Sequence, residues 1–225
     1  MGISVKSHHT QRRSTALSLV LLSDTHELHR KIDVPYGEIL IHAGDFTLFS
    51  RSLRAIEDFN TWLGELPHPH KVVVPGNHEF FLEGDLSRRS LLSNATVLIK
   101  EAIEIGGLHI WGSPVTPLFG AAFGMSSAED RRKMYAGIPE STDLVVSHGP
   151  PYGILDAAPE SGFHSGCREL FDAIMRVKPK LVACGHVHGA YGIFQTDDTT
   201  FVNAALLGLH GGIDKAPIVL RMSRR

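Results

Sequence analysis

The sequence predicts an α/β fold in which buried strands alternate with amphipathic helices. Short apolar runs recur along the 225 residues, each followed by a glycine or a polar cluster. Their length and their content of β-branched residues suit buried strands. Two segments between these runs repeat apolar residues at intervals of three and four, which is typical of a helix with one apolar face. This alternation indicates an α/β architecture.

The expected elements follow in order along the chain. Strands are expected at Leu17–Leu22, Ile39–Ile41, Lys71–Val74, Leu108–Trp111, Leu144–Val146 and Lys180–Ala183. Helices are expected over the apolar positions from Leu53 to Leu63 and from Leu170 to Val177, the second beginning near Ser165. Short strand-like pieces from Tyr191 to Leu220, punctuated by Gly, Asp-Asp and Pro, favour a mixed or second sheet in the C-terminal part.

Composition excludes several classes of protein. The chain has 22 Lys+Arg and 24 Asp+Glu, a net charge of −2, so we expect no basic face for a nucleic-acid polymer or an anionic membrane. No apolar run reaches the roughly 18 residues of a transmembrane helix. Cys167 and Cys184 are too few for a disulfide scaffold or a thiolate zinc site. They fit a reducing compartment, and we expect a cytoplasmic location.

The length predicts a single domain, over residues 16–225, after an N-terminal arm. Residues 1–15 are polar and basic, and we expect them to be disordered. Arg12 and Arg13 before an apolar run imitate a secretory signal. Because that run leads directly into Asp24 and His26, a strand is the better interpretation.

Polar side chains follow five of the expected strands. In α/β sheets, the loops beyond the carboxyl ends of strands bring distant residues together. A single Asp or His at such a place is more often a turn residue, a helix cap or a hydrogen-bonded core residue. Five strand ends in this order favour one shared site: Asp24 and His26, then Asp45, then Asn77 and His78, then His148, then His186 and His188.

These side chains indicate a kind of metal. Two carboxylates, one carboxamide oxygen and several imidazoles, without thiolate, suit manganese, iron or zinc better than calcium or magnesium, and we expect Mn²⁺. Seven ligands are too many for one ion, but they fill two ions if one carboxylate bridges them. Such pairs of ions clamp the attacking and leaving oxygens in phosphoryl displacement.

The five blocks resemble the calcineurin-like metallophosphoesterase superfamily, whose pattern is D-x-H, G-D, G-N-H-[DE], H and G-H-x-H. The resemblance spans Leu17 to about Leu220. It implies a two-sheet sandwich flanked by helices, with four layers in the order αββα. It also implies a dinuclear site at one edge of the sheets.

The resemblance also implies a role for each residue of the site. The first ion would be held by Asp24, His26 and His188, the second by Asn77, His148 and His186, and Asp45 would bridge the two. His78 would be the general acid for the leaving group, and a hydroxide bridging the metals would be the nucleophile. Glu79 would be a structural hydrogen-bonding residue.

Further segments resemble the branch of metallophosphoesterase-domain-containing proteins: Gly112-Ser113-Pro114, residues 147–151, residues 166–170 and Val202-Asn203-Ala204. That branch is associated with hydrolysis of cyclic nucleotides and other phosphodiesters. Some of its members have glycine in place of His186, whose presence here implies a complete second metal site. We therefore expect a small phosphodiester or nucleotide as the substrate.

Two other functions stay open. A phosphomonoesterase or protein phosphatase could share this fold. However, protein Ser/Thr phosphatases have an acidic residue where Leu48 stands and an arginine where Pro75 stands. A catalytically silent scaffold, like the retromer subunit of this fold, would be expected to have lost ligands or the catalytic histidine.

Several residues outside the blocks have two interpretations. His164 and Arg168 could contact the substrate phosphate, or they could be an exposed loop histidine and a solvated arginine. Cys167 is expected to be a small packing residue. We expect His68 to be an exposed loop residue, and His29 could line the pocket.

Overall fold

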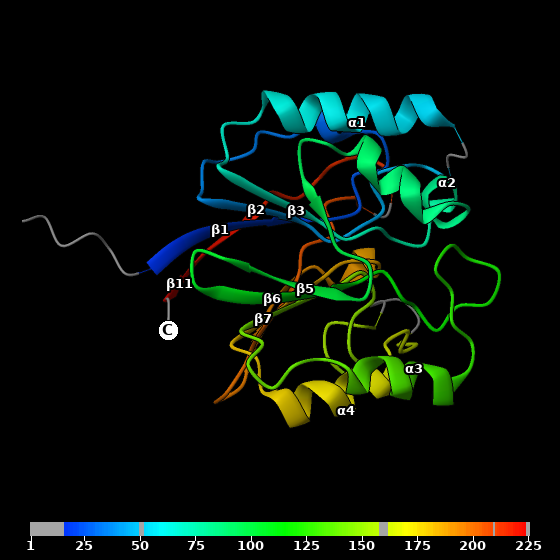
Figure 1. The fold of residues 1–225 in the computed structure, drawn as a ribbon, viewed down its shortest axis with the longest axis vertical. Helices are drawn as coiled ribbons and strands as arrows, with labels where there is room; N and C mark the ends of the chain where they lie inside the picture. The colour runs from blue at the N-terminus through cyan, green and yellow to red at the C-terminus, as the bar shows by residue number, and fades with distance from the viewer. Residues whose placement is uncertain (1–15, 50–51, 158–161, 209, 224–225) are drawn as a thin grey trace, which may run out of the picture.

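The computed structural model describes residues 16–49, 52–157, 162–208 and 210–223. Two β-sheets pack face to face, and helices cover their outer faces (Figure 1). The α/β fold with two sheets flanked by helices is therefore confirmed. The arm expected over residues 1–15 lies outside the described residues. No described helix is long and apolar enough to cross a bilayer.

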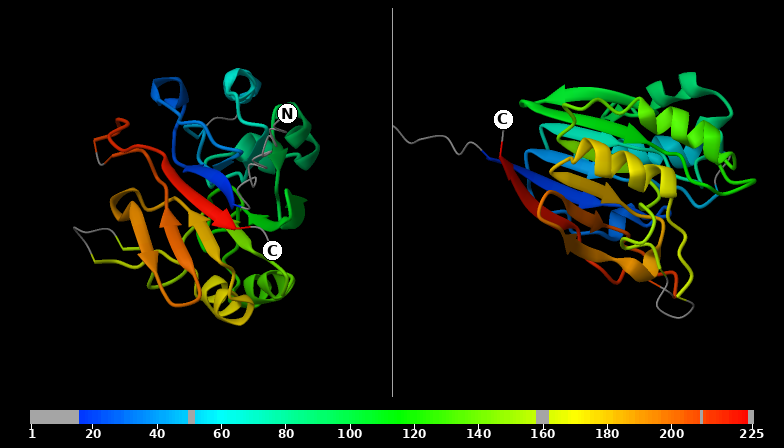
Figure 2. Two further views of the ribbon diagram at one scale, coloured as in Figure 1. Left: turned by 90° about the vertical axis from the view of Figure 1, so that its left-hand side faces the viewer. Right: turned by 90° about the horizontal axis from the view of Figure 1, so that it is seen from below.

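The first sheet has the strand order β11-β1-β2-β3-β4. Its strands are β1 (Ala16–Leu22), β2 (Ile39–His42), β3 (His70–Val73), β4 (Thr96–Val97) and β11 (Ile218–Ser223). Strands β1 to β4 run parallel, and β11 pairs antiparallel with β1. Figure 2 shows β11 beside β1, at the opposite ends of the chain. Because β1, β2 and β3 are parallel and adjacent, they end at the same edge.

The second sheet has the strand order β5-β6-β7-β8-β10-β9. Its strands are β5 (Glu101–Ile105), β6 (Leu108–Ser113), β7 (Leu144–Ser147), β8 (Leu181–Cys184), β9 (Gly192–Gln195) and β10 (Thr200–Asn203). The four central strands are parallel, and the outer strands β5 and β9 are antiparallel to their neighbours. Strands β7 and β8 therefore also end together.

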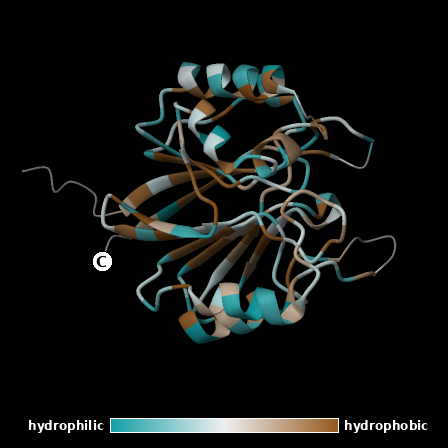
Figure 3. Ribbon diagram, turned by 45° about the vertical axis from the view of Figure 1, so that its right-hand side comes forward, coloured by the Kyte–Doolittle hydropathy of each residue, from teal (hydrophilic) through white to brown (hydrophobic). Residues whose placement is uncertain are grey.

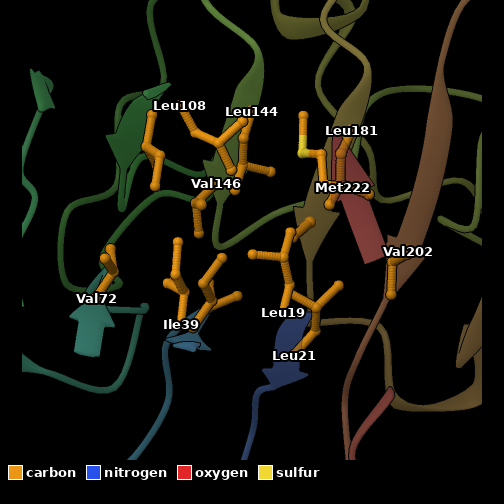
Figure 4. Packing of buried hydrophobic residues seen from close by; sticks show 14 of the residues in the cluster. Leu19, Leu21, Ile39, Val72, Leu108, Leu144, Val146, Leu181, Val202 and Met222 are labelled. Atoms are coloured by element: carbon orange, nitrogen blue, oxygen red, sulfur yellow. The ribbon is translucent and has the colours of Figure 1, made fainter. Parts of the chain in front are cut away.

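Apolar side chains are buried on both faces of each sheet. In β1, Leu19 and Leu21 belong to the core between the sheets, whereas Val20 belongs to the core beneath α1 (Leu53–Glu65). Figure 4 shows side chains of both sheets meeting in the first core. Burial on both faces explains why the central strands β2, β7 and β8 are largely apolar rather than alternating sequences.

Helices α3 (Ala128–Ala136) and α4 (Arg168–Val177) cover the second sheet, and a short helix α2 (Phe80–Glu83) follows β3. Their hydrophilic faces point outward, and the strands between the helix layers are largely hydrophobic (Figure 3). Leu170, Ile174 and Val177 of α4 pack onto the outer face of the second sheet. Helix α4 begins at Arg168, not near Ser165 as expected, because the preceding segment forms a bridge between Pro151 and Cys167.

Apolar periodicity did not predict α3 because five consecutive residues of this nine-residue helix are charged. Only Arg131 and Tyr135 of this helix are buried. Its start is fixed locally, since the side chain of Ser127 accepts a hydrogen bond from the backbone N–H of Asp130.

Candidate metal centre

The loops after β1, β2, β3, β7 and β8 converge where the edges of the two sheets meet. Their side chains form three overlapping groups of donors, and the candidate ligand atoms in each group lie within 4.8 Å of one another. The groups are Asp24 with His26 and His188, His26 with Asp45 and His78, and Asp45 with His148 and His186.

The first group joins the two sheets. Asp24 follows β1, and His188 begins the turn after β8. The Nε2 atom of His188 lies 3.1 Å from Oδ1 of Asp24 and 3.4 Å from Nε2 of His26. The two ring nitrogens and the carboxylate oxygen therefore lie close enough together to bind one cation.

The group of Asp45, His148 and His186 is centred on His148, which follows β7 and is completely buried. Its Nε2 atom lies 2.8 Å from Oδ1 of Asn77 and 3.3 Å from Oδ2 of Asp45. Its Nδ1 atom lies 2.9 Å from the carbonyl oxygen of Ala43, which fixes the ring orientation. His186 completes the group, with its ring centroid 5.0 Å from that of His148.

Asp45 belongs to two of the three groups and joins them. Its Oδ2 atom is 3.3 Å from His148, 3.7 Å from Nε2 of His78 and 3.9 Å from Nε2 of His26. One carboxylate oxygen thus faces histidines from both groups. This is the position that a bridging ligand requires.

Unusual backbone conformations direct these side chains into the site. Asp24, Asp45 and His186 have φ angles of 54°, 54° and 69°, and His26 has 41°. Residues other than glycine rarely adopt positive φ, and such conformations persist where the surrounding structure enforces them. Here the backbone N–H of His186 donates to Oδ2 of Asp24, which joins the loops of the two sheets.

Glu79 holds two of the loops together. Its buried carboxylate accepts hydrogen bonds from the backbone N–H groups of Asp45, Thr47 and Gly76, and from the hydroxyl of Thr47. Burial and the charge of Asp45 raise the pKa of Glu79 to about 7. These contacts agree with the structural role expected for Glu79.

Glycines allow the ligands to lie close to the backbone. A Cβ atom at Gly76 would overlap the carboxylate of Asp45 and would lie 2.8 Å from Cε1 of His148. A Cβ atom at Gly185 would overlap the carboxylate of Asp24. Both positions therefore require glycine for a close approach rather than for their own dihedral angles.

The electrostatics of the site favour a bound cation. Burial alone would lower the pKa of His148, but the adjacent Asp45 raises it to about 9. Burial likewise opposes ionisation of Asp24 and Asp45, yet the neighbouring histidines lower the pKa of both carboxyl groups. The carboxylates thus hold a proton on His148, and a metal ion could take its place.

A family model described as calcineurin-like phosphoesterase matches residues 17–190, which include all of these donors. The chain belongs to this family. Membership and the histidine–aspartate groups together indicate a metal-dependent phosphoester hydrolase.

Curated relatives of this calcineurin-like family match most of the chain. Metallophosphoesterase domain-containing protein 1 of Homo sapiens is 35% identical, with 89% of this chain and 69% of the relative covered. The UPF0046 protein K07C11.7 of Caenorhabditis elegans is 33% identical, with 93% and 76% covered. A solved crystal structure with 14% identity superposes with a TM-score of 0.59, covering 92% of this chain and 99% of its own, and supports the fold.

His164 and Arg168 lie beside Tyr152, in the loop that leaves β7, and within the described residues neither side chain contacts the donor groups. Nδ1 of His164 lies 2.7 Å from Oδ1 of the buried Asp156. The guanidinium of Arg168 lies 3.7 Å above the ring of Tyr152. Sequence reasoning missed Asp156 because its loop has no strand or helix pattern that would single it out.

The expectation of an exposed His68 was wrong, and of the two interpretations of His29 the structure favours packing. His68 is buried, not exposed, because its Nε2 atom lies 2.9 Å from the carbonyl oxygen of Pro35 and its ring stacks on Tyr36. His29 does not line the site. It packs against Phe59 and Trp62 of α1.

Cys167 is buried in the core beneath α4, as expected for a packing residue. Burial raises the pKa of its thiol to about 11, so the thiol stays protonated at neutral pH. Cys184 is also buried, at the end of β8, and its thiol donates to the carbonyl oxygen of Val202.

One contact of His78 was not expected. The exposed ring of Phe49 stacks on the imidazole, with 3.6 Å between ring centroids. The only sequence signal for this contact is the position of Phe49. It stands four residues after Asp45, where protein phosphatases have the arginine of G-D-x-x-D-R-G.

Proposed function

We propose that the protein is a phosphodiesterase that acts on small phosphodiesters with two divalent cations. The observation that carries the proposal is the shared position of Asp45, whose Oδ2 atom faces His26, His148 and His78. Two cation-binding groups that meet at one carboxylate, with a further histidine beside it, suit phosphoryl transfer. The mixed nitrogen and oxygen donors favour manganese, with iron or zinc as alternatives.

The ligands proposed for the first ion are Asp24, His26 and His188, those for the second are Asn77, His148 and His186, and Asp45 is shared. When bound, the two cations would neutralise phosphoryl oxygens and acidify water. The protein holds the imidazoles in fixed orientations through Ala43 and Thr47, whose carbonyl oxygens contact the Nδ1 atoms of His148 and His26.

His78 is proposed to give a proton to the leaving oxygen. Its Nε2 atom lies 3.7 Å from Asp45, so it faces the place where a scissile phosphate would lie between the two groups. A positioned histidine of this kind typically contributes about 10²-fold to 10⁴-fold in rate.

The sequence lacks the arginine that protein phosphatases have at the position of Pro75, and this favours diesters as substrates. Leu48 and Pro75 stand where protein phosphatases have an acid and an arginine. A diester carries one negative charge, so two cations and one histidine can balance the charge that develops in the transition state. A monoester carries more charge and gains more from an arginine.

His164 and Arg168 are proposed to bind the part of the substrate that does not react. The buried carboxylate of Asp156 fixes His164 and also accepts from the backbone N–H groups of Gly153 and Gly166. Among the described residues Arg168 makes no ion pair, and its guanidinium, stacked on Tyr152, is open to an anionic or aromatic group. The substrate class that fits is a nucleotide-like diester.

The test compares bis(4-nitrophenyl) phosphate with 4-nitrophenyl phosphate, using the purified chain with Mn²⁺ and metal analysis of the same sample. We expect a higher kcat/KM for the diester, and a panel of cyclic nucleotides then identifies the natural class. A strong preference for the monoester would replace the proposal by a phosphomonoesterase. No turnover of either ester by metal-loaded protein would favour a silent scaffold.

A further inference from the structure

We propose that Phe49 is the positioning residue of His78, so that ring stacking orients the proton donor where a hydrogen-bonded acid is absent. The inference rests on the proposed function for its kinetic consequence. The orientation of His78 itself can be measured without any activity.

The imidazole of His78 lies between two rings. The ring of Phe49 stacks on one face, with a centroid separation of 3.6 Å and an interplanar angle of 23°. The ring of His26 contacts it in an edge arrangement, at 4.5 Å and 62°. Because His26 is itself held through Nδ1 by the carbonyl of Thr47, the imidazole is confined on both sides.

Hydrogen bonding does not fix this imidazole. Within the described residues, the buried Nδ1 atom of His78 has no hydrogen-bond partner. A catalytic histidine is commonly oriented by a bond from that nitrogen to a carboxylate or a carbonyl group. Stacking is the restraint that remains to keep Nε2 directed toward Asp45.

The loop that carries Phe49 is held in place by carboxylates. Glu79 accepts from the backbone N–H of Thr47, and Glu27 accepts from that of Leu48 at 3.1 Å. Phe49 has a φ angle of 51°, a backbone conformation that residues other than glycine rarely adopt. The loop therefore presents the ring to His78 although 58% of Phe49 is exposed to solvent.

An exposed phenylalanine in a strained backbone conformation contributes little to the stability of the fold. Burial of the ring is incomplete, and its close stacked contact is made with His78. The ring of Phe80, which packs against the core beneath α1, lies farther away, with 6.5 Å between centroids. The contact is therefore better explained by the restraint it places on His78 than by the stability of the fold.

The kinetic test uses Phe49→Leu, which keeps an apolar side chain without a ring, and Phe49→Tyr, which keeps the ring. With bis(4-nitrophenyl) phosphate and Mn²⁺, we expect Phe49→Leu to lower kcat by about tenfold with little change in KM. Phe49→Tyr should stay near the unsubstituted protein. In a His78→Ala background, Phe49→Leu should have no further effect, because its role acts only through His78.

The exposed Phe194 of the edge strand β9 provides a matched control, since Phe194→Leu removes an exposed ring elsewhere and should leave kcat unchanged. The proposal would be overturned if Phe49→Leu kept full activity. A loss that persists unchanged in the His78→Ala background would also overturn it.

An NMR measurement tests the contact without activity. The ring protons of His78, assigned by their loss in His78→Gln, are recorded on the full chain with diamagnetic Zn²⁺. Stacking predicts upfield shifts that Phe49→Leu removes and Phe49→Tyr retains. Unchanged shifts in Phe49→Leu would refute the proposal. A chain with these shifts but no phosphodiesterase activity would refute the proposed function and leave the orientation by Phe49 standing.

Discussion

His42 and His148 are both completely buried histidines, but their surroundings set opposite protonation states. Burial lowers the pKa of His42 to about 3, although the charge of Asp24 opposes this. His148 contacts Asp45 directly, and its pKa rises to about 9. Direct contact with the carboxylate of Asp45 thus accounts for the higher pKa of His148 than of His42.

The neutral state of His42 predicts part of the acid sensitivity of the fold. Its Nδ1 atom accepts from the backbone N–H of Gly44, and its Nε2 atom contacts the hydroxyl of Thr25. Below pH 6.5 the unfolded chain binds a proton at this residue, whereas the folded chain resists it down to about pH 3. Where the unfolded chain binds one more proton than the folded chain, the free energy of unfolding falls by about 1.4 kcal/mol for each unit by which the pH decreases.

Urea unfolding of metal-free protein between pH 7 and pH 4 checks this expectation. In His42→Gln, stability should fall less steeply with decreasing pH than in the unsubstituted protein. Equal slopes for the two proteins would show that His42 does not contribute.

Asp45→Ala is expected to remove metal and activity together. The substitution withdraws the carboxylate that faces histidines of both groups, so neither proposed ion keeps its full set of donors. Metal analysis after dialysis against Mn²⁺ measures the loss. The exposed Asp198, which pairs with Lys178 on the surface, gives a matched control, since Asp198→Ala should retain both properties. Full metal content in Asp45→Ala would contradict the proposed bridge.

His78→Ala is expected to separate metal binding from turnover. Since His78 is proposed as a proton donor rather than a ligand, metal content should stay near that of the unsubstituted protein. Turnover of bis(4-nitrophenyl) phosphate should fall by about 10²-fold or more. If the variant instead lost its metals, His78 would be a ligand.

At the scale of elements, a buried ion pair joins helices α3 and α4. Nε of Arg131 lies 2.8 Å from Oε2 of Glu169, and these side chains are only 10% and 7% exposed. Nη1 of Arg131 also donates to the carbonyl oxygens of Met125 and Ser126. The pair explains why α3 needs so few apolar residues to pack beside α4.

Glu169→Ala should destabilise the protein by about 3 kcal/mol, because it leaves the guanidinium of Arg131 buried without its partner. Thermal and urea unfolding measure the change. The exposed pair of Glu129 and Lys133 on α3 supplies the control. Glu129→Ala should leave stability unchanged within error, since exposed pairs contribute little. Equal effects of the two substitutions would contradict the role of the buried pair.

At the scale of the whole molecule, the site is built from both sheets. Asp24, Asp45 and Asn77 come from the first sheet, whereas His148 and His188 come from the second. A cation bound between them would cross-link the two layers in the folded state only. Metal binding is therefore expected to stabilise the complete fold rather than one loop.

Unfolding with Mn²⁺ and with EDTA tests this coupling. A metal concentration 100 times the dissociation constant should add about 2.7 kcal/mol for one site. The melting temperature should rise with metal in the unsubstituted protein and not in Asp45→Ala. The same melting temperature with and without metal would show that the donor groups bind no cation in the folded state.

The sequence predicted the strands that carry the site because most of them, such as β2, β7 and β8, are largely apolar runs buried on both faces. Strands β1, β2 and β7 begin within one residue of their expected positions. Helix α3 and the short strand β4 escaped prediction, since a polar helix and a two-residue strand have no apolar periodicity. His68 was placed wrongly because its burial depends on Tyr36 and Pro35 from another loop.

By itself the sequence determined which residues could serve as ligands, because strand ends and donor chemistry are local properties that can be read in order. Only the tertiary structure decided which donors share a group, since Asp24 and His188 come together through the packing of two sheets. The same holds for the Phe49 ring on His78, the Asp156 carboxylate beside His164 and the protonation of His148. These contacts and this protonation state depend on distances and burial in the folded structure, which the spacing of residues along the chain does not give.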